Sequence, residues 1–173
     1  MITIRPAIPT DCESIASVDV AAHWESYRDL LPESAFENAT VPIRSKKWKE
    51  ILTGPDLISV YVADQGGGLV GYAVGGRAAD AENLGQEMQV QAIYLLDRAK
   101  RQGVGSALLR TLIRDFLAGG ANSASVWMLR DNLPARRFYE RHGAQFVTEK
   151  VQRFSGYDRA LVGYIWLNLA SAL

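Results

Sequence analysis

The stretch Lys100-Arg101-Gln102-Gly103-Val104-Gly105-Ser106 decides the fold, because it joins an apolar run to an amphipathic one. The run from Val90 to Leu96 has the composition of a buried strand, and from Val104 onward apolar residues recur at helical spacing. Two glycines directly before a helix allow a tight bend and let the backbone come close to a ligand. The N–H groups of the first helical turn, with two basic side chains beside them, attract an anion. We therefore predict a pyrophosphate-binding turn.

Two common phosphate-binding patterns do not fit this turn. A P-loop needs Gly-x-x-x-x-Gly-Lys-Ser/Thr, and the dinucleotide fingerprint needs a third glycine where Leu108 stands. A nucleotide-hydrolysing or dinucleotide-binding protein is therefore disfavoured. A Gly-x-Gly pair alone is also compatible with an ordinary strand-to-helix turn, so a second motif is needed.

The second motif is Asn132-Leu133-Pro134-Ala135-Arg136-Arg137-Phe138-Tyr139-Glu140-Arg141-His142-Gly143-Ala144. An apolar strand that ends in a basic Gly-x-Gly turn, followed by Asn-x-x-Ala-x-x-Phe-Tyr-x-x-x-Gly, resembles the GCN5-related N-acetyltransferase (GNAT) family. The resemblance covers residues 57–147 best. A looser resemblance to small-molecule members, including phosphinothricin-type enzymes, lies in Trp24-x-x-Tyr27-Arg28 before Leu30-Leu31-Pro32.

The resemblance implies acetyl-CoA as cosubstrate. In that family the first motif binds the pyrophosphate, and main-chain groups at the end of the preceding strand hold the pantetheine arm and the thioester carbonyl. The second motif supplies an asparagine that contacts the cofactor and a tyrosine near its sulfur. The cofactor-binding residues expected on this basis are Ile93, Tyr94, Leu95, Lys100, Arg101, Gln102, Gly103, Val104, Gly105, Ser106, Asn132, Ala135, Arg136 and Tyr139.

The resemblance also implies a general acid. The tyrosine that matches Tyr139 is the family's proposed donor of a proton to the departing thiolate, and an ordinary phenol pKa of about 10 keeps that proton in place at neutral pH. Helix-to-sheet packing is the alternative role for Phe138 and Tyr139. Asn132 can cap the helix as well as contact the cofactor.

This chain differs from the family at the position of the base. Gln89 stands where many members of the family carry a glutamate, and glutamine cannot accept a proton. Glu87, two residues earlier, would face the same side of an extended strand by period-two alternation. We expect Glu87 to take the proton from the amine; the alternatives are a water chain or an acceptor amine of low pKa.

The acceptor is expected to be the primary amine of a small molecule or an amino acid. In this fold it usually enters between the amino-terminal helices and the final hairpin, so Trp24 and Tyr27 are the expected substrate-binding residues, and Glu25 could hold a cationic amine. Packing is the alternative role for these side chains. Cys12 lies far in sequence from the cofactor motifs, which favours direct transfer without a covalent enzyme intermediate. Protein N-terminal acetylation, or an acetyl-CoA sensor without turnover, are the alternative functions.

Composition agrees with an enzyme domain. Nineteen basic residues balance nineteen acidic ones among 173, so nothing indicates a nucleic acid or a membrane surface as partner. One cysteine and two histidines make a zinc site within the chain unexpected. Because no secretory signal or membrane-spanning run is visible, we expect a cytoplasmic protein, and the resemblance implies a homodimer as one possible state.

Hydrophobic periodicity predicts strands and helices in mixed order. The first helix is expected to begin at Thr10 or Asp11, where a side chain can cap it. Further helices are expected at 43–52, from 104 to the Gly119-Gly120 pair, and at 133–142. Strands are expected at 2–6, 57–63, 69–75, 87–96 and 125–129, followed by a hairpin around Gly156. We predict a single α/β (α+β) domain over residues 1–173, GNAT-like, with a mixed central sheet of about six to seven strands flanked by helices.

Overall fold

The computed structural model describes residues 1–55, 58–78, 83–154 and 157–173. Contacts between Cα atoms group the chain into two compact units. Unit 1 comprises Met1–Val74 and Ala92–Leu112, and unit 2 comprises Gly75–Gln91 and Ile113–Leu173.

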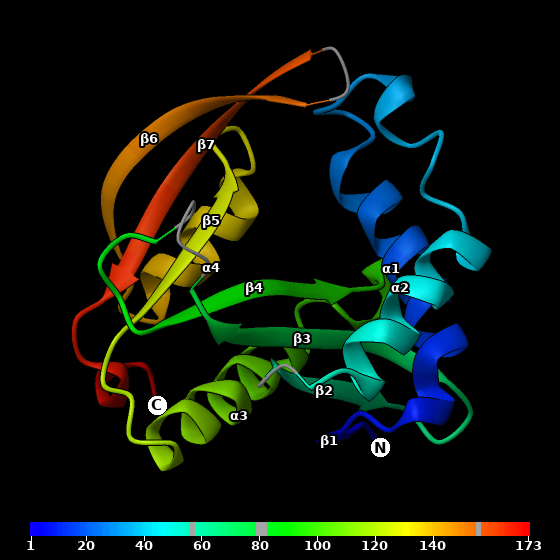
Figure 1. Ribbon diagram of the computed structural model, residues 1–173, viewed down its shortest axis with the longest axis horizontal. Coiled ribbons are helices and arrows are strands. Elements are labelled where there is room, and N and C mark those ends of the chain that lie inside the picture. The colour runs from blue at the N-terminus through cyan, green and yellow to red at the C-terminus, as the bar shows by residue number, and fades with distance from the viewer. Residues whose placement is uncertain (56–57, 79–82, 155–156) are drawn as a thin grey trace. The chain divides into compact units, whose positions relative to one another are not determined.

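The described residues form a seven-stranded sheet with the strand order β1-β2-β3-β4-β5-β7-β6 (Figure 1). The strands are β1 (Thr3–Pro6), β2 (Ile58–Asp64), β3 (Leu69–Arg77), β4 (Met88–Leu95), β5 (Ala124–Leu129), β6 (Gln145–Phe154) and β7 (Tyr157–Trp166). The α-helices are α1 (Cys12–Tyr27), α2 (Val41–Thr53), α3 (Val104–Ala118) and α4 (Leu133–Arg141). Single 3₁₀ turns are η1 (Pro9–Asp11), η2 (Glu33–Ala35), η4 (Asp97–Ala99) and η5 (Leu169–Ala172). Because β4 pairs with β5 in parallel while β1–β2, β5–β7 and β6–β7 are antiparallel, the sheet is mixed, as predicted.

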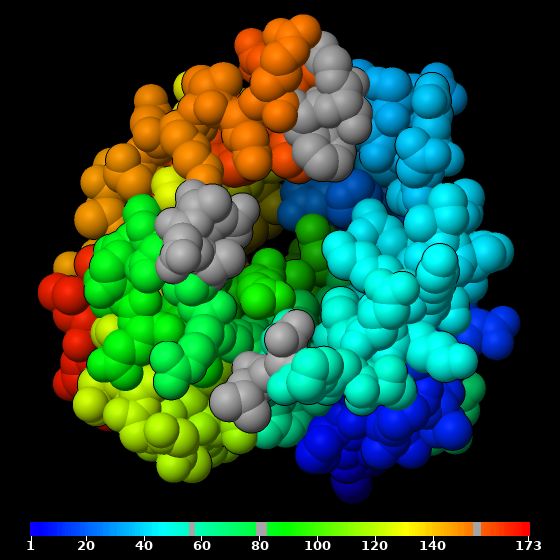
Figure 2. Space-filling view, in the orientation of Figure 1, coloured from blue at the N-terminus to red at the C-terminus, as the bar shows by residue number. Residues whose placement is uncertain are grey.

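In unit 1, α1 and α2 share a core with β2 and β3. Apolar residues of α1 recur at helical spacing and pack with Trp48 of α2, Val62 of β2 and Val74 of β3. The two helices run side by side in Figure 1, and α2, in cyan, covers part of α1 in Figure 2. Full burial of one large apolar side chain stabilises by about 1.5–3 kcal/mol, so this shared core holds α1 in place.

Asp19 is a buried carboxylate of α1 whose partners come from α2 and β3. Trp48 Nε1 donates to it at 3.1 Å, the Tyr72 hydroxyl donates at 3.0 Å, and Arg44 Nε lies 3.7 Å away. Burial, with the nearby Asp19 charge, raises the pKa of Tyr72 well above its ordinary value. The charge of Asp19 is thus compensated from α2 and β3, and the contacts fix how these elements pack.

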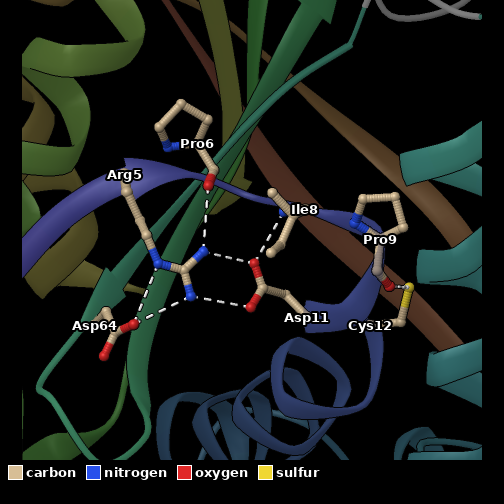
Figure 3. A network of polar contacts seen from close by, with 7 residues as sticks. All are labelled: Arg5, Pro6, Ile8, Pro9, Asp11, Cys12 and Asp64. Atoms are coloured by element: carbon tan, nitrogen blue, oxygen red, sulfur yellow. Dashed lines mark hydrogen bonds and ion pairs between the residues drawn. The ribbon is translucent and has the colours of Figure 1, made fainter.

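Arg5 of β1 joins the first strand to β2 and to the start of α1 (Figure 3). Its guanidinium donates to both carboxylate oxygens of Asp11, at 2.7 and 3.0 Å, and to Asp64 at 3.1 and 3.2 Å. The prediction that Thr10 or Asp11 caps the first helix is wrong in this respect. Asp11 stands at the N-cap position, but it makes no capping hydrogen bond, because its carboxylate binds Arg5 and the N–H of Ile8.

In unit 2, β7 lies between β5 and β6. It pairs with all of β5, from Ala124 opposite Trp166 to Leu129 opposite Leu161, and forms a long hairpin with β6. A register shift between Phe146 and Thr148 makes a bulge in β6. The predicted hairpin is confirmed, but its predicted turn at Gly156 lies outside the described residues, as does Leu57, the predicted start of the second strand.

Candidate active site

The predicted pyrophosphate turn has the backbone that a tight approach to a ligand requires. Gly103 has φ of +79°, and nothing lies within 4 Å of the position that a Cβ would occupy. Arg101 also has positive φ, +59°, which the sequence did not indicate. Residues 101–103 are exposed, and α3 begins at Val104 as predicted. A cavity of about 440 Å³ borders the turn and is lined by Met1, Ile2, Ile4, Gln65, Gln102, Gly103, Val104 and Ala107.

Side chains within the turn hold it in shape. Lys100 Nζ forms an ion pair with Asp97 at 2.7 Å, and the Gln102 amide donates to the carbonyl oxygen of Arg98 at 2.6 Å. Both contacts join the loop back to η4, a 3₁₀ turn that the sequence did not indicate. The Lys100 charge therefore has an acidic neighbour within the turn, whereas the Arg101 side chain is exposed.

The end of β4, predicted to hold the pantetheine arm, packs tightly against β3. A Cβ on Gly71 would lie 2.8 Å from the carbonyl oxygen of Tyr94 and closer still to the side chain of Leu95. The N–H of Leu96 donates to the carbonyl oxygen of Val70 at 2.9 Å. Along the other edge, β4 pairs with β5 over Met88–Val90, and Ile93, Tyr94 and Leu95 follow this paired stretch.

The two predicted acceptor residues lie in an aromatic cluster of unit 1. The Tyr27 and Tyr94 hydroxyls are 3.0 Å apart, and the His23 ring meets Tyr27 edge-on at 4.9 Å. Trp24 is 45% exposed and meets Phe36, also at 4.9 Å. Burial, with Tyr27 close by, raises the pKa of Tyr94 well above its ordinary value, so its hydroxyl keeps its proton. Phe36 was not predicted, because it stands alone in a polar segment.

Glu25 contacts the main chain of the segment that follows β4. Its carboxylate accepts a hydrogen bond from the main-chain N–H of Asp97 at 2.8 Å. The expectation that this side chain could hold a cationic amine overlooked that contact, since Asp97 is 72 residues away in the sequence.

In unit 2, Asn132 caps α4. Its side-chain oxygen accepts from the N–H of Ala135 at 3.2 Å, which confirms the expected cap. Arg136 of the same helix donates to the Tyr164 hydroxyl at 3.1 Å, and that hydroxyl donates to Glu140 at 2.7 Å. The pKa of Arg136 is raised, chiefly by its hydrogen bond with Tyr164. These contacts fix α4 against β7.

Tyr139 lies on this fixed helix and is 6% exposed. Its ring meets Phe138 at 5.1 Å and Trp166 at 5.8 Å, both edge-on. Packing against β7 therefore sets the orientation of the ring, which a general acid also requires.

The candidate base differs from expectation. β4 begins at Met88, so Glu87 lies just before the strand, at an exposed bend where its N–H donates to Ser123 Oγ at 3.3 Å. Gln89, by contrast, is 4% exposed. The expectation that the two share one face of the strand is wrong, because alternation holds only within an extended segment. The role of Glu87 as base stays a prediction.

The predicted site residues thus form two groups. Unit 1 contains Trp24, Tyr27, the end of β4 and the turn from Lys100 to Ser106. Unit 2 contains Glu87, Asn132, Ala135, Arg136 and Tyr139. Within unit 1, the hydroxyls of Tyr27 and Tyr94 are in contact. Within unit 2, the side chain of Asn132 accepts a hydrogen bond from the N–H of Ala135.

A sequence model of the acetyltransferase (GNAT) family matches residues 21–144. The chain belongs to this family. It is therefore an acyltransferase of the GNAT type, as the two motifs predicted, and the expectation of acetyl-CoA as cosubstrate is confirmed.

Relatives extend the GNAT match over almost the whole chain. YuaI of Bacillus subtilis strain 168, an uncharacterized N-acetyltransferase, is 31% identical over 172 residues, which are 99% of this chain and 96% of that protein. YncA of Salmonella typhimurium, solved with its cofactor acetyl-CoA, has a TM-score of 0.71 at 20% identity, with 98% of this chain and 94% of that one covered. The PaiA N-acetyltransferase of Thermoplasma acidophilum, solved with coenzyme A, has a TM-score of 0.69 at 18% identity, with 94% and 98% covered. These likenesses show that the fold is the GNAT fold.

The turn of this GNAT chain fits the pyrophosphate of acetyl-CoA. The open space at the missing Cβ of Gly103 leaves its backbone approachable, and the exposed Arg101 adds a positive charge. Among the described residues, no helix combines the length and apolar character needed to cross a membrane. Nor, over the same ranges, do three or more His, Cys, Asp or Glu side chains gather as a metal site would require.

Proposed function

We propose that this chain, acting as one domain over residues 1–173, transfers the acetyl group of acetyl-CoA directly to the primary amine of a small molecule or an amino acid. The observation that carries this proposal is the contact between the Tyr27 and Tyr94 hydroxyls at 3.0 Å. It joins a residue expected at the acceptor to the strand end expected at the thioester.

Each group of residues has a proposed task. The turn from Lys100 to Ser106 binds the pyrophosphate through main-chain N–H groups and Arg101. Main-chain groups of Ile93, Tyr94 and Leu95 orient the pantetheine arm. When bound, acetyl-CoA supplies the acetyl group and a thiol leaving group.

Tyr139 donates the proton that the departing thiolate needs. Asn132 and Ala135 hold the start of its helix, and Arg136 fixes that helix through Tyr164. The amine must lose a proton before it attacks, and Glu87 or a water chain takes it.

Direct transfer is favoured by the environment of Cys12. The thiol is buried and donates to the carbonyl oxygen of Pro9 at 2.8 Å. A cysteine nucleophile must be reached by the substrate, and the side chain of Cys12 is buried in the apolar core. We therefore propose no acetylated enzyme intermediate.

The test is release of the coenzyme A thiol from acetyl-CoA with pools of small amines, amino acids and short peptides. Tyr139→Phe should lower kcat about tenfold or more, with the KM for acetyl-CoA little changed, because the hydroxyl acts only as the bond to sulfur breaks. Tyr61→Phe on β2 is the matched control, since it removes a phenol hydroxyl from a residue outside the proposed site.

The pools also separate the alternative functions. Activity with small amines or amino acids supports the proposal, and activity with peptides alone would replace it with protein N-terminal acetylation. Tight binding of acetyl-CoA without thiol release in any pool would favour the sensor. A sensor needs no catalytic base, and glutamine at position 89 cannot act as one. Equal kcat for Tyr139→Phe and wild type would remove Tyr139 from its proposed role.

A further inference from the structure

The last turns of α1 contact the chain segment that leads from β4 into α3, and both belong to unit 1. Tyr27 meets Tyr94 through its hydroxyl, and the His23 ring lies 6.2 Å from the Tyr94 ring. One further contact reaches beyond the strand: the Glu25 carboxylate accepts from the N–H of Asp97 at 2.8 Å.

The N–H of Asp97 is the first of the 3₁₀ turn η4, so no residue within that turn can accept its hydrogen bond. The later N–H groups of the turn are satisfied locally, Ala99 by Leu96 and Lys100 by Asp97. A hydrogen bond to a carboxylate is stronger than one between neutral groups. Glu25 therefore caps η4 from a separate helix.

Asp97 in turn holds the cofactor turn. Its side chain pairs with Lys100 at 2.7 Å, and the next residue, Arg98, accepts at its carbonyl oxygen from Gln102. A displacement of η4 would thus move Lys100 and Gln102, which lie three residues and one residue before Gly103. The contacts connect Glu25 to the pyrophosphate turn in two steps.

We propose that Glu25 is a positioning residue for acetyl-CoA: it holds η4, and through η4 it holds the pyrophosphate-binding turn in its binding conformation. This rests on the proposed function of that turn. It assigns to the acceptor-side helix a role in cofactor affinity, and it gives a structural task to a carboxylate beside the predicted acceptor residues.

Three variants separate position from charge. Glu25→Gln loses the charge but keeps an oxygen at the same reach, Glu25→Asp keeps the charge but is one methylene shorter, and Glu25→Ala loses both. Coenzyme A affinity measured by calorimetry should fall by about twofold for Gln, whose neutral oxygen accepts a weaker hydrogen bond, and by about three- to tenfold for Asp and Ala, which lose the hydrogen bond. Glu13→Ala, an exposed glutamate at the other end of α1, should leave affinity unchanged.

Steady-state kinetics provide the second measurement. Glu25→Asp should raise the KM for acetyl-CoA by a similar factor and leave kcat and the acceptor KM close to wild type. The opposite pattern, in which Glu25→Gln raises the acceptor KM and Glu25→Asp does not, would show that the charge holds the amine and would overturn the proposal. Equal coenzyme A affinity for Asp, Ala and wild type would overturn it as well.

Failure of this inference differs from failure of the proposed function. If the wild type binds coenzyme A but does not turn over acetyl-CoA, the proposed transferase activity is wrong. The coenzyme A affinities of the Glu25 variants would still decide whether Glu25 positions the turn. Wild type that does not bind coenzyme A at all would contradict both.

Discussion

Gly103 is the residue where the cofactor turn depends most directly on the absence of a side chain. Its φ of +79° is costly for other residues, so Gly103→Ala should destabilise the fold by about 1 kcal/mol. It should also weaken coenzyme A binding about tenfold or more, because the turn must relax and a methyl group enters the space before it. Gly66→Ala is a matched control, with φ of +73° and equally open surroundings in the β2–β3 turn. It should lose similar stability and keep coenzyme A affinity; equal losses of affinity in both would show a general effect of strain.

The residues that could be predicted are those whose role depends on near neighbours. Gly103 and the Asn132 cap follow from motifs a few residues long. Asp11 was mistaken for a cap because its stronger partner, Arg5, comes from another element. The positive φ of Arg101 has no sequence signal, since arginine rarely adopts it.

The approach of β3 to β4 depends on Gly71. A Cβ there would lie 2.8 Å from the Tyr94 carbonyl oxygen, which is backbone and cannot rotate away. Gly71→Ala should therefore cost about 1–3 kcal/mol of unfolding free energy and displace the end of β4. Because that strand end is proposed to orient the pantetheine arm, the KM for acetyl-CoA should rise as well. Gly67→Ala, with nothing within 4 Å of its Cβ, is the control in urea unfolding and kinetics. An unchanged midpoint for Gly71→Ala would mean that β3 and β4 separate easily.

Elements were predictable to the extent that their signals are periodic. The α3 and α4 ranges, and the end of α2 at Gly54, follow from helical spacing and from Gly or Pro at the ends. The contacts between elements were not predictable. Asp19, for example, accepts hydrogen bonds from Trp48, 29 residues away, and from Tyr72, 53 residues away. No local pattern specifies a pair at such separation, so a single sequence predicts elements better than the contacts that position the site.

The stability of the whole chain should depend on pH through the contacts that Arg5 makes. The hydrogen bond from Arg5 lowers the pKa of Asp11 below its ordinary 3.8. The pKa of Asp64 is lowered chiefly by the hydrogen bond from the N–H of Gly66 and, to a smaller extent, by that from Arg5. A carboxylate with a lowered folded pKa contributes stability that is fully present above the ordinary value and is lost as pH falls through the folded value. The free energy of unfolding should therefore fall as the pH is lowered from about 5 toward 2.

Asp11→Asn tests whether this acid sensitivity comes from the pair with Arg5. At neutral pH the variant should be about 1–2 kcal/mol less stable than wild type in urea unfolding, since it loses a charged partner that Arg5 contacts at 2.7 and 3.0 Å. The difference should shrink as the pH falls below about 3.8, because the unfolded chain then binds a proton that folded Asp11 takes up only at a lower pH. Asp29→Asn is the control, since that side chain is 90% exposed and lies 3.9 Å from Arg28 Nε; its effect on stability should be small. A difference for Asp11→Asn that stays constant from pH 7 to the acid limit would show that shape, rather than charge, makes this contact stabilising, and the acid sensitivity would then have to come from other carboxylates.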